Sequence, residues 1–264
     1  MLRSAILRIR QGEARPVLWR WPLPFWITVS YLVAMLTALL MVTTWREDDL
    51  MNPDATSILL AGIIGGLLAL WLAIRNIQAA LIDAETTSKQ RQDDLTVSRL
   101  LALEESRTRP LWIVWLMALA TIILIDALAL VAGKPASNLP IGLDRIDSAA
   151  WETWFLALIL FAGVRPITEE LIFRGILYPA LARWLDNNLL AALATAALFT
   201  IFYLLQVLNA DLGWTTIYWG FIYPLTLGLT ASLARAHTKS TWAAVGSHVM
   251  FGLFLVLSAM VTFA

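Results

Sequence analysis

Two adjacent carboxylates, Glu169 and Glu170, stand inside an otherwise apolar stretch of the chain. Arg165 precedes Glu169 by four residues. Arg174 follows Glu170 by the same number, and this spacing places each pair on one face of a helix. Adjacent residues point about 100° apart around a helix, so one carboxylate can face water while its neighbour is held in an ion pair. The pattern is typical either of a functional site at membrane depth or of an ion-paired cluster that only orients the helix.

Three further polar side chains fall within apolar stretches: Asp126, Gln206 and His248. An intramembrane polar group either serves a reaction or transport, or hydrogen-bonds a neighbouring helix, and residue type alone leaves both explanations open. The chain contains two histidines, His237 and His248, no H-E-x-x-H motif and no cysteine. A catalytic zinc usually needs three protein ligands, so we predict no metal and no cofactor.

The composition indicates a membrane protein. Hydrophobic residues make up 59% of the 264, charged residues only 14%, and the mean hydropathy is +0.73. A soluble domain of this size cannot bury so much apolar surface, so the excess must face lipid. The formal net charge is +0, and without a basic surplus no nucleic-acid partner is expected. The lipid bilayer is therefore the first predicted partner.

Hydropathy divides the chain into about seven apolar stretches, most of them long enough to cross the bilayer. Backbone groups in lipid must be satisfied within their own segment, so the stretches are predicted to be helices and the fold class is all-α, polytopic. The predicted spans are 25–45, 56–74, 111–132, 150 onward, 189–208, 215–234 and 242–264.

The basic residues predict the orientation. If the N-terminus is cytoplasmic, all but three of the 19 lysines and arginines lie on or toward the cytoplasmic side, the exceptions being Arg46, Lys134 and Arg145. This asymmetry predicts a multi-pass membrane protein with a cytoplasmic N-terminus and an external C-terminus.

The polar segments divide the chain into three regions. Residues 1–22 form an arginine-rich cytoplasmic segment that can lie on the membrane as an amphipathic helix. Residues 23–133 hold the first three spans, with a polar stretch at 75–109 that is predicted to form a cytoplasmic helical hairpin. Residues 150–264 hold a four-helix C-terminal core with all the chemically suggestive residues except Asp126.

The sequence Glu169-Glu170-Leu-Ile-Phe-Arg174-Gly resembles the first motif, E-E-x-x-x-R, of the CPBP intramembrane proteases. That family includes the type II CAAX prenyl proteases and the Abi-like, bacteriocin-processing proteins of bacteria. Its second motif, F-x-x-x-H, is matched by position at Phe202-Tyr-Leu-Leu-Gln206, and its third, H-x-x-x-N, at His248-Val-Met-Phe-Gly252. The order and separation fit, but glutamine and glycine replace the family histidine and asparagine.

The resemblance implies an intramembrane endopeptidase, in a bacterial plasma membrane, that hydrolyses a peptide bond of a membrane-associated peptide or protein. By position, Glu169 would be the general base, and Glu170 and Arg174 would support it or hold substrate. Gln206 stands in place of the water-orienting histidine. His248 would stabilise the oxyanion, where Gly252 offers no second side-chain donor.

Two alternatives remain from other functional classes. A catalytically impaired relative would bind a membrane peptide or protein through the same residues without cutting it. A small transporter would use Asp126, Glu169 and Glu170 as its intramembrane acids. No internal repeat is visible in the sequence, and many transporters contain one.

Overall fold

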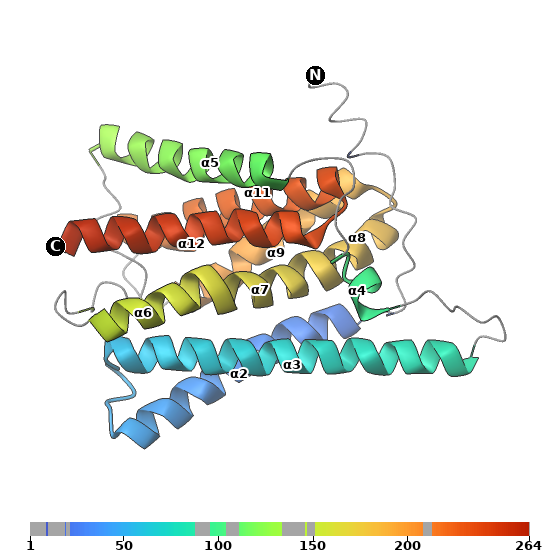
Figure 1. Cartoon of the computed structure of the whole chain (residues 1–264), viewed down its shortest axis with the longest axis horizontal. Coiled ribbons are helices and arrows are strands. Elements are labelled where there is room, and N and C mark those ends of the chain that lie inside the picture. Colours follow the sequence, from blue (N-terminus) through green and yellow to red (C-terminus); the bar gives the residue numbers. More distant parts are fainter. Residues whose placement is uncertain are drawn as a thin grey trace.

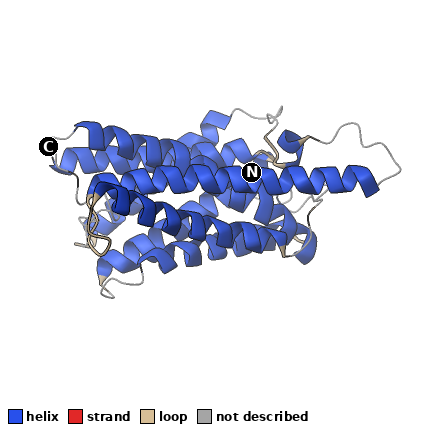
Figure 2. Ribbon diagram, turned by 90° about the horizontal axis from the view of Figure 1, so that it is seen from below, coloured by secondary structure: helices blue, strands red, loops and turns tan. Residues whose placement is uncertain are grey.

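The computed structural model describes residues 9, 19, 22–87, 96–103, 111–133, 146, 151–207 and 213–263, and within these ranges it contains helices and turns but no strand. The helices lie side by side in an elongated bundle (Figure 1, Figure 2). Five are long and apolar enough to cross a membrane. They are α2 (Leu23–Arg46), α3 (Ala55–Thr87), α5 (Leu111–Val131), α9 (Asn188–Val207) and α12 (Thr241–Phe263).

Two further runs cross the bundle as chains of short helices. The first consists of α6 (Trp151–Ile159), η1 (Leu160–Val164), α7 (Arg165–Glu170), η2 (Leu171–Leu177) and α8 (Tyr178–Leu185). The second consists of α10 (Trp214–Ile217), η3 (Tyr218–Ile222) and α11 (Tyr223–Thr238). With the five long helices they account for the seven predicted spans, which confirms the all-α, polytopic fold class. Consecutive spans alternate in direction, so that α12 ends at the same end of the bundle as the α2–α3 connection (Figure 1).

The η segments are π-helical turns, each followed by a proline. Arg165, the residue before Pro166, donates its N–H to the Leu160 carbonyl five residues earlier, and the same pattern precedes Pro179 and Pro224. A proline lacks an N–H and its ring clashes with the carbonyl four residues before it, so the helix widens there. Widened turns therefore lie on both sides of α7, which carries the two glutamates.

Glycines on α3 allow the N-terminal spans to lie close to this acidic helix. A Cβ at Gly65 would lie 2.9 Å from the Cα of Met35 on α2, and one at Gly66 would lie 2.7 Å from the side chain of Val164. The Thr168 hydroxyl on α7 donates to the Gly66 carbonyl at 3.2 Å. The first two spans thus contact the acidic helix directly.

The hairpin predicted at 75–109 falls within the described residues only at 75–87 and 96–103, and it stays a prediction. α3 extends beyond the apolar span to Thr87, and a short helix, α4 (Val97–Leu100), lies against the bundle. Leu100, Leu101 and Ala102 are buried there, and Thr241, at the start of α12, donates its N–H to the Ala102 carbonyl at 2.8 Å. Burial of these three apolar residues explains why α4 packs on the bundle and does not project into water.

The predicted N-terminal segment, 1–22, lies outside the described residues apart from Ile9, Trp19 and Pro22. Trp19 is buried, and its indole N–H donates to the Ile176 carbonyl of η2 at 3.2 Å. This contact attaches Trp19 to η2, the segment that follows the acidic helix α7.

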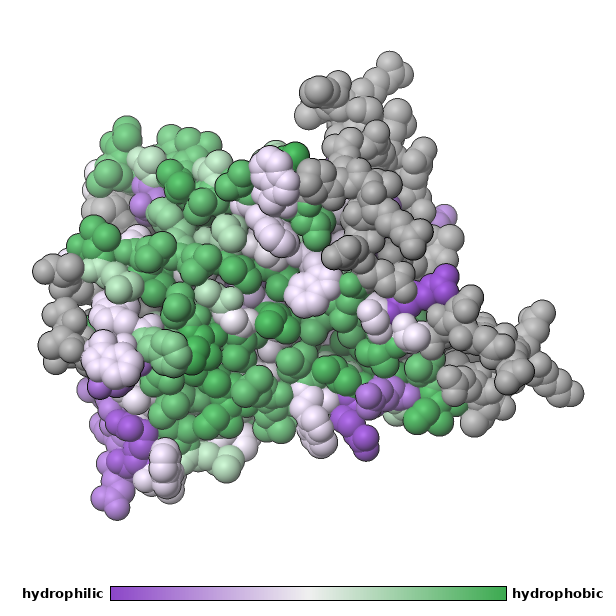
Figure 3. All heavy atoms as spheres, in the orientation of Figure 1, coloured by the Kyte–Doolittle hydropathy of each residue, from purple (hydrophilic) through white to green (hydrophobic). Residues whose placement is uncertain are grey.

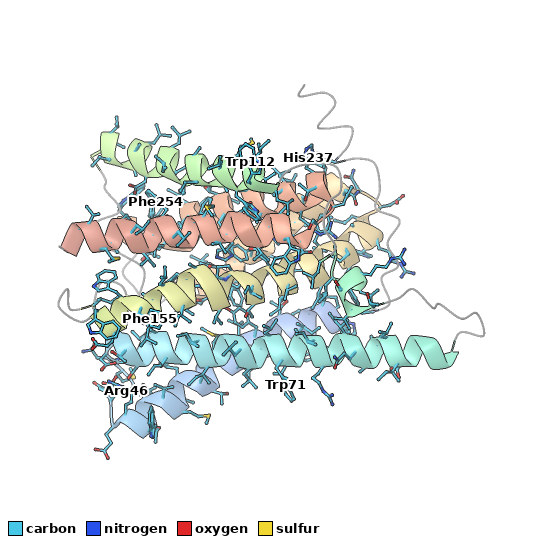
Figure 4. All side chains as sticks on the ribbon, viewed as in Figure 1. Arg46, Trp71, Trp112, Phe155, His237 and Phe254 are labelled. Carbon is cyan, nitrogen blue, oxygen red and sulfur yellow. The ribbon has the colours of Figure 1, made fainter. Side chains whose placement is uncertain are left out.

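The outer surface agrees with a lipid environment. Figure 3 shows apolar residues over the middle of the visible face and hydrophilic residues mainly toward the ends of the helices. Arg46 lies at one end of the bundle, where it pairs with Asp54 at 2.8 Å, and His237 lies toward the other (Figure 4). Trp71 is exposed on the outside of α3. The chain is an integral membrane protein.

Candidate active site

The acidic pair occupies the last turn of α7 and is completely buried. Arg165 Nε donates to Glu169 Oε1 at 2.8 Å, and Arg174 Nη1 donates to Glu170 Oε1 at 2.9 Å. Both ion pairs join residues four apart, as their spacing predicted. A buried carboxylate is tolerated only when it is paired and hydrogen-bonded, so the two arginines account for its presence inside the bundle.

Two tyrosines from other helices also bind Glu169. The Tyr31 hydroxyl on α2 donates to Oε1 at 3.0 Å, and the Tyr203 hydroxyl on α9 donates to Oε2 at 2.8 Å. Tyr31 stacks on Phe202 with ring centroids 5.1 Å apart, and the Arg165 guanidinium lies 4.6 Å from the centroid of the Tyr203 ring. Three helical runs therefore fix the position of this carboxylate.

His248 on α12 lies between the two glutamates. Its Nδ1 is 2.9 Å from Glu170 Oε1 and its Nε2 is 3.9 Å from Glu169 Oε2. An ionised carboxylate only accepts hydrogen bonds, so Nδ1 carries a proton in this arrangement. In the neutral imidazole, Nε2 is then an acceptor that faces the Glu169 carboxylate.

One oxygen of this network has no partner among the described residues. Glu170 Oε1 is shared by Arg174 and His248, whereas Glu170 Oε2 is buried and accepts no hydrogen bond there. A buried polar atom without a partner costs free energy, so this oxygen is suited to a water or a substrate donor.

Arg174 is held by the neighbouring span. Its Nη2 donates to the Gly228 carbonyl at 2.9 Å, and its Nε donates to the Ser232 hydroxyl at 3.3 Å. Its guanidinium also lies 4.5 Å from the centroid of the Phe199 ring. With these partners and Glu170, Arg174 is bound on several sides.

Gln206 lies apart from the carboxylates. It is exposed near the end of α9, where its Oε1 accepts from Arg165 Nη2 at 3.3 Å and its Nε2 donates to the Phe202 carbonyl at 3.3 Å. Glu170, Arg174 and His248 thus share one hydrogen-bonded network, and Glu169 lies beside it with its Oε2 3.9 Å from His248 Nε2. Among the described residues, Gln206 is linked to Glu169 through Arg165.

No side chain fits at Gly252. A Cβ there would overlap the Phe161 carbonyl oxygen and lie 2.6 Å from its carbon. The backbone of η1 therefore fills the space that a side chain of α12 would need one turn after His248. The glycine permits this close helix contact, and an asparagine could not replace it without moving η1.

Sequence reasoning missed Tyr31 and Tyr203. Tyr31 is 138 residues from Glu169 in the chain, and no motif links the two. Tyr203 could have been found from the second motif. Placed one helical turn earlier, the family's F-x-x-x-H falls on Phe199 and Tyr203, which have the same four-residue spacing. Phe199 is fully buried and lies 6.1 Å from His248 between ring centroids.

Asp126 takes no part in the acidic network seen in the described residues. It lies on α5, half-buried, and is hydrogen-bonded to Tyr218 of η3. This contact is a helix–helix hydrogen bond between two spans. Within the described ranges, no group of three or more acidic residues or histidines is arranged to hold a metal ion.

The comparisons with known proteins agree with the motifs. Residues 151–254 match the family described as Type II CAAX prenyl endopeptidase Rce1-like. This segment is similar to the CPBP proteases. The chain is also 30% identical over 125 residues to the "Putative membrane peptidase YdiL" of Bacillus subtilis (strain 168), a stretch that covers 47% of the chain and 44% of that relative. The match spans less than half of either protein. No solved structure matches the chain.

Proposed function

We propose that the chain is an intramembrane endopeptidase that hydrolyses a peptide bond in a membrane-associated peptide or protein. The observation that carries this proposal is the placement of the Glu169 carboxylate next to the His248 imidazole inside a CPBP-type segment. A water molecule can lie within hydrogen-bond reach, about 2.8 Å, of two atoms that are 3.9 Å apart.

The reaction would proceed by acid–base catalysis. Such a water donates one hydrogen bond to Glu169 Oε2 and another to His248 Nε2, and its oxygen attacks the peptide carbonyl carbon. Glu169 takes the proton of the water as the new C–O bond forms, and the carbonyl oxygen becomes an oxyanion. The C–N bond then breaks, and Glu169 returns the proton to the leaving nitrogen. Glu170, which is itself paired with Arg174, holds His248 in the required orientation.

The test measures the rate at which the full chain, in lipid vesicles, cleaves a panel of membrane-associated peptides, and whether that cleavage depends on Glu169. Loss of a general base typically costs about 10²–10⁴ in rate, and we expect Glu169→Gln to lose activity within this range. Glu152→Gln is the matched control, because Glu152 is an exposed carboxylate at the start of the same helical run. Equal cleavage by Glu169→Gln and wild type would refute the proposal.

A catalytically impaired binding protein is the second candidate. Both oxygens of Glu169 already accept hydrogen bonds, and Gly252 supplies no side-chain donor, which favours a site that holds a peptide without cutting it. Binding of a panel peptide without Glu169-dependent cleavage would support this candidate over the peptidase. The transporter alternative is weaker, because Asp126 pairs with Tyr218 whereas Glu169 and Glu170 pair with arginines.

A further inference from the structure

The side chain of α9 that contacts the acidic pair is Tyr203. Its hydroxyl lies 2.8 Å from Glu169 Oε2, the same oxygen that is 3.9 Å from His248 Nε2. Tyr203 is buried, whereas Gln206, three residues later, is exposed. Phenol and imidazole thus flank one oxygen of the proposed general base.

The orientation of His248 leaves one requirement of peptide hydrolysis unmet. Its Nδ1–H is directed to Glu170, so in the neutral imidazole Nε2 has no proton to donate. The oxyanion of a tetrahedral intermediate needs a hydrogen-bond donor, and a side chain at Gly252 is excluded by Phe161. Tyr203 carries a hydroxyl proton at the position where the attacking water would meet Glu169.

We propose, on the basis of the peptidase function above, that Tyr203 is a catalytic residue that donates the hydrogen bond to the oxyanion. In the resting site its hydroxyl donates to Glu169 Oε2. When Glu169 takes the proton of the attacking water, its carboxyl becomes neutral and a weaker acceptor, and the hydroxyl turns to the newly charged oxygen. Tyr203 keeps its proton throughout, so it neither gains nor loses a covalent bond.

The surroundings of Tyr203 suit this role. Its ring lies below the Arg165 guanidinium, 4.6 Å from ring centroid to cation, and against Phe199, with centroids 4.8 Å apart. These contacts fix the ring, while the hydroxyl can still rotate about the C–O bond. Because the fixed ring holds the hydroxyl oxygen in position, only the O–H bond has to rotate as charge develops on the oxyanion.

Tyr31 provides the matched comparison. It makes the same kind of hydrogen bond to Glu169, but to Oε1, the oxygen that Arg165 also binds. Tyr31→Phe and Tyr203→Phe each remove one hydroxyl from a buried phenol and should lower thermal stability to a similar degree. Only the second removes the donor on the side of His248.

The test measures kcat and KM of the full chain in lipid vesicles, with a peptide that wild type cleaves in a Glu169-dependent manner. We expect Tyr203→Phe to lower kcat by about 10²–10³-fold with little change in KM, because removal of one oxyanion donor has this effect in other hydrolases. Tyr31→Phe should lower kcat much less. Tyr203→His should recover part of the lost kcat, since an imidazole can also donate.

The outcomes separate this inference from the function on which it rests. Glu169-dependent cleavage that Tyr203→Phe leaves intact, or lowers no more than Tyr31→Phe does, would overturn the role of Tyr203 alone. A loss of kcat in Gln206→Ala with normal turnover in Tyr203→Phe would also overturn it and would assign the role to Gln206. Absence of cleavage by wild type would overturn both proposals.

Discussion

Substitution of Gly252 is expected to damage the protein, although asparagine stands at this position in the family motif. Gly252→Ala adds one methyl group, which would overlap the Phe161 carbonyl oxygen and lie 2.6 Å from its carbon. The obstacle is backbone, so no side-chain rotation relieves it. Either α12 or η1 must move.

The cost follows from overpacking. An extra methylene forced into a packed interior costs about 1–3 kcal/mol, and a backbone obstacle places Gly252→Ala at the upper end of that range. For a domain of this size each kcal/mol lowers the melting temperature by about 2–4 °C, so we expect a decrease of roughly 6–12 °C. Gly252→Asn should cost at least as much. The displacement would also separate His248 from Glu170, which now lie 2.9 Å apart, and cleavage should fall with stability.

The assay is thermal unfolding of the full chain in one detergent, together with peptide cleavage below the melting temperature. Gly163→Ala is the control, because Gly163 lies in the same η1 turn and a Cβ there would meet nothing within 4 Å. The melting temperature of Gly163→Ala should equal or exceed that of wild type, since alanine is favoured over glycine inside a helix by about 0.5–1 kcal/mol. If Gly252→Ala and Gly163→Ala have the same melting temperature, the Phe161 backbone does not exclude a side chain at residue 252, and the prediction is wrong. Higher turnover in Gly252→Asn would refute the reasoning about the site.

Two further predictions concern the ion pairs and the topology. Arg174→Gln should lower the free energy of unfolding by about 3–5 kcal/mol, because it leaves the buried Glu170 without its cation. The double variant with Glu170→Gln should lose less than the sum of the single variants, and additive losses in chemical denaturation would contradict the pairing. The chain has no cysteine, so cysteines introduced at Gln92 and Ser137 can be labelled selectively. The basic residues predict labelling from opposite sides of the membrane, and labelling from the same side would refute the seven-span topology.

The sequence was sufficient for features that depend on local spacing. Seven spans follow from hydropathy, and the pairing of Arg165 with Glu169 follows from their positions on one helical face. The exposed position of Gln206 could not be predicted, because the π-helical turns and the helix contacts decide which turn of α9 meets the acidic pair. A shift of one turn exchanges Gln206 for Tyr203, and both fit a four-residue spacing after a phenylalanine.

The acidic site includes residues from outside the segment that matches the family. The segment that matches the family begins at residue 151, yet α2 supplies a hydroxyl to Glu169, and α3 supplies the carbonyl of Gly66 to Thr168, the residue before Glu169. Helices that associate in lipid gain little from the hydrophobic effect, so such hydrogen bonds and the close contacts at glycines determine how they pack. The first two spans therefore complete the acidic site, and residues 151–254 expressed alone would lack one of the three donors to Glu169.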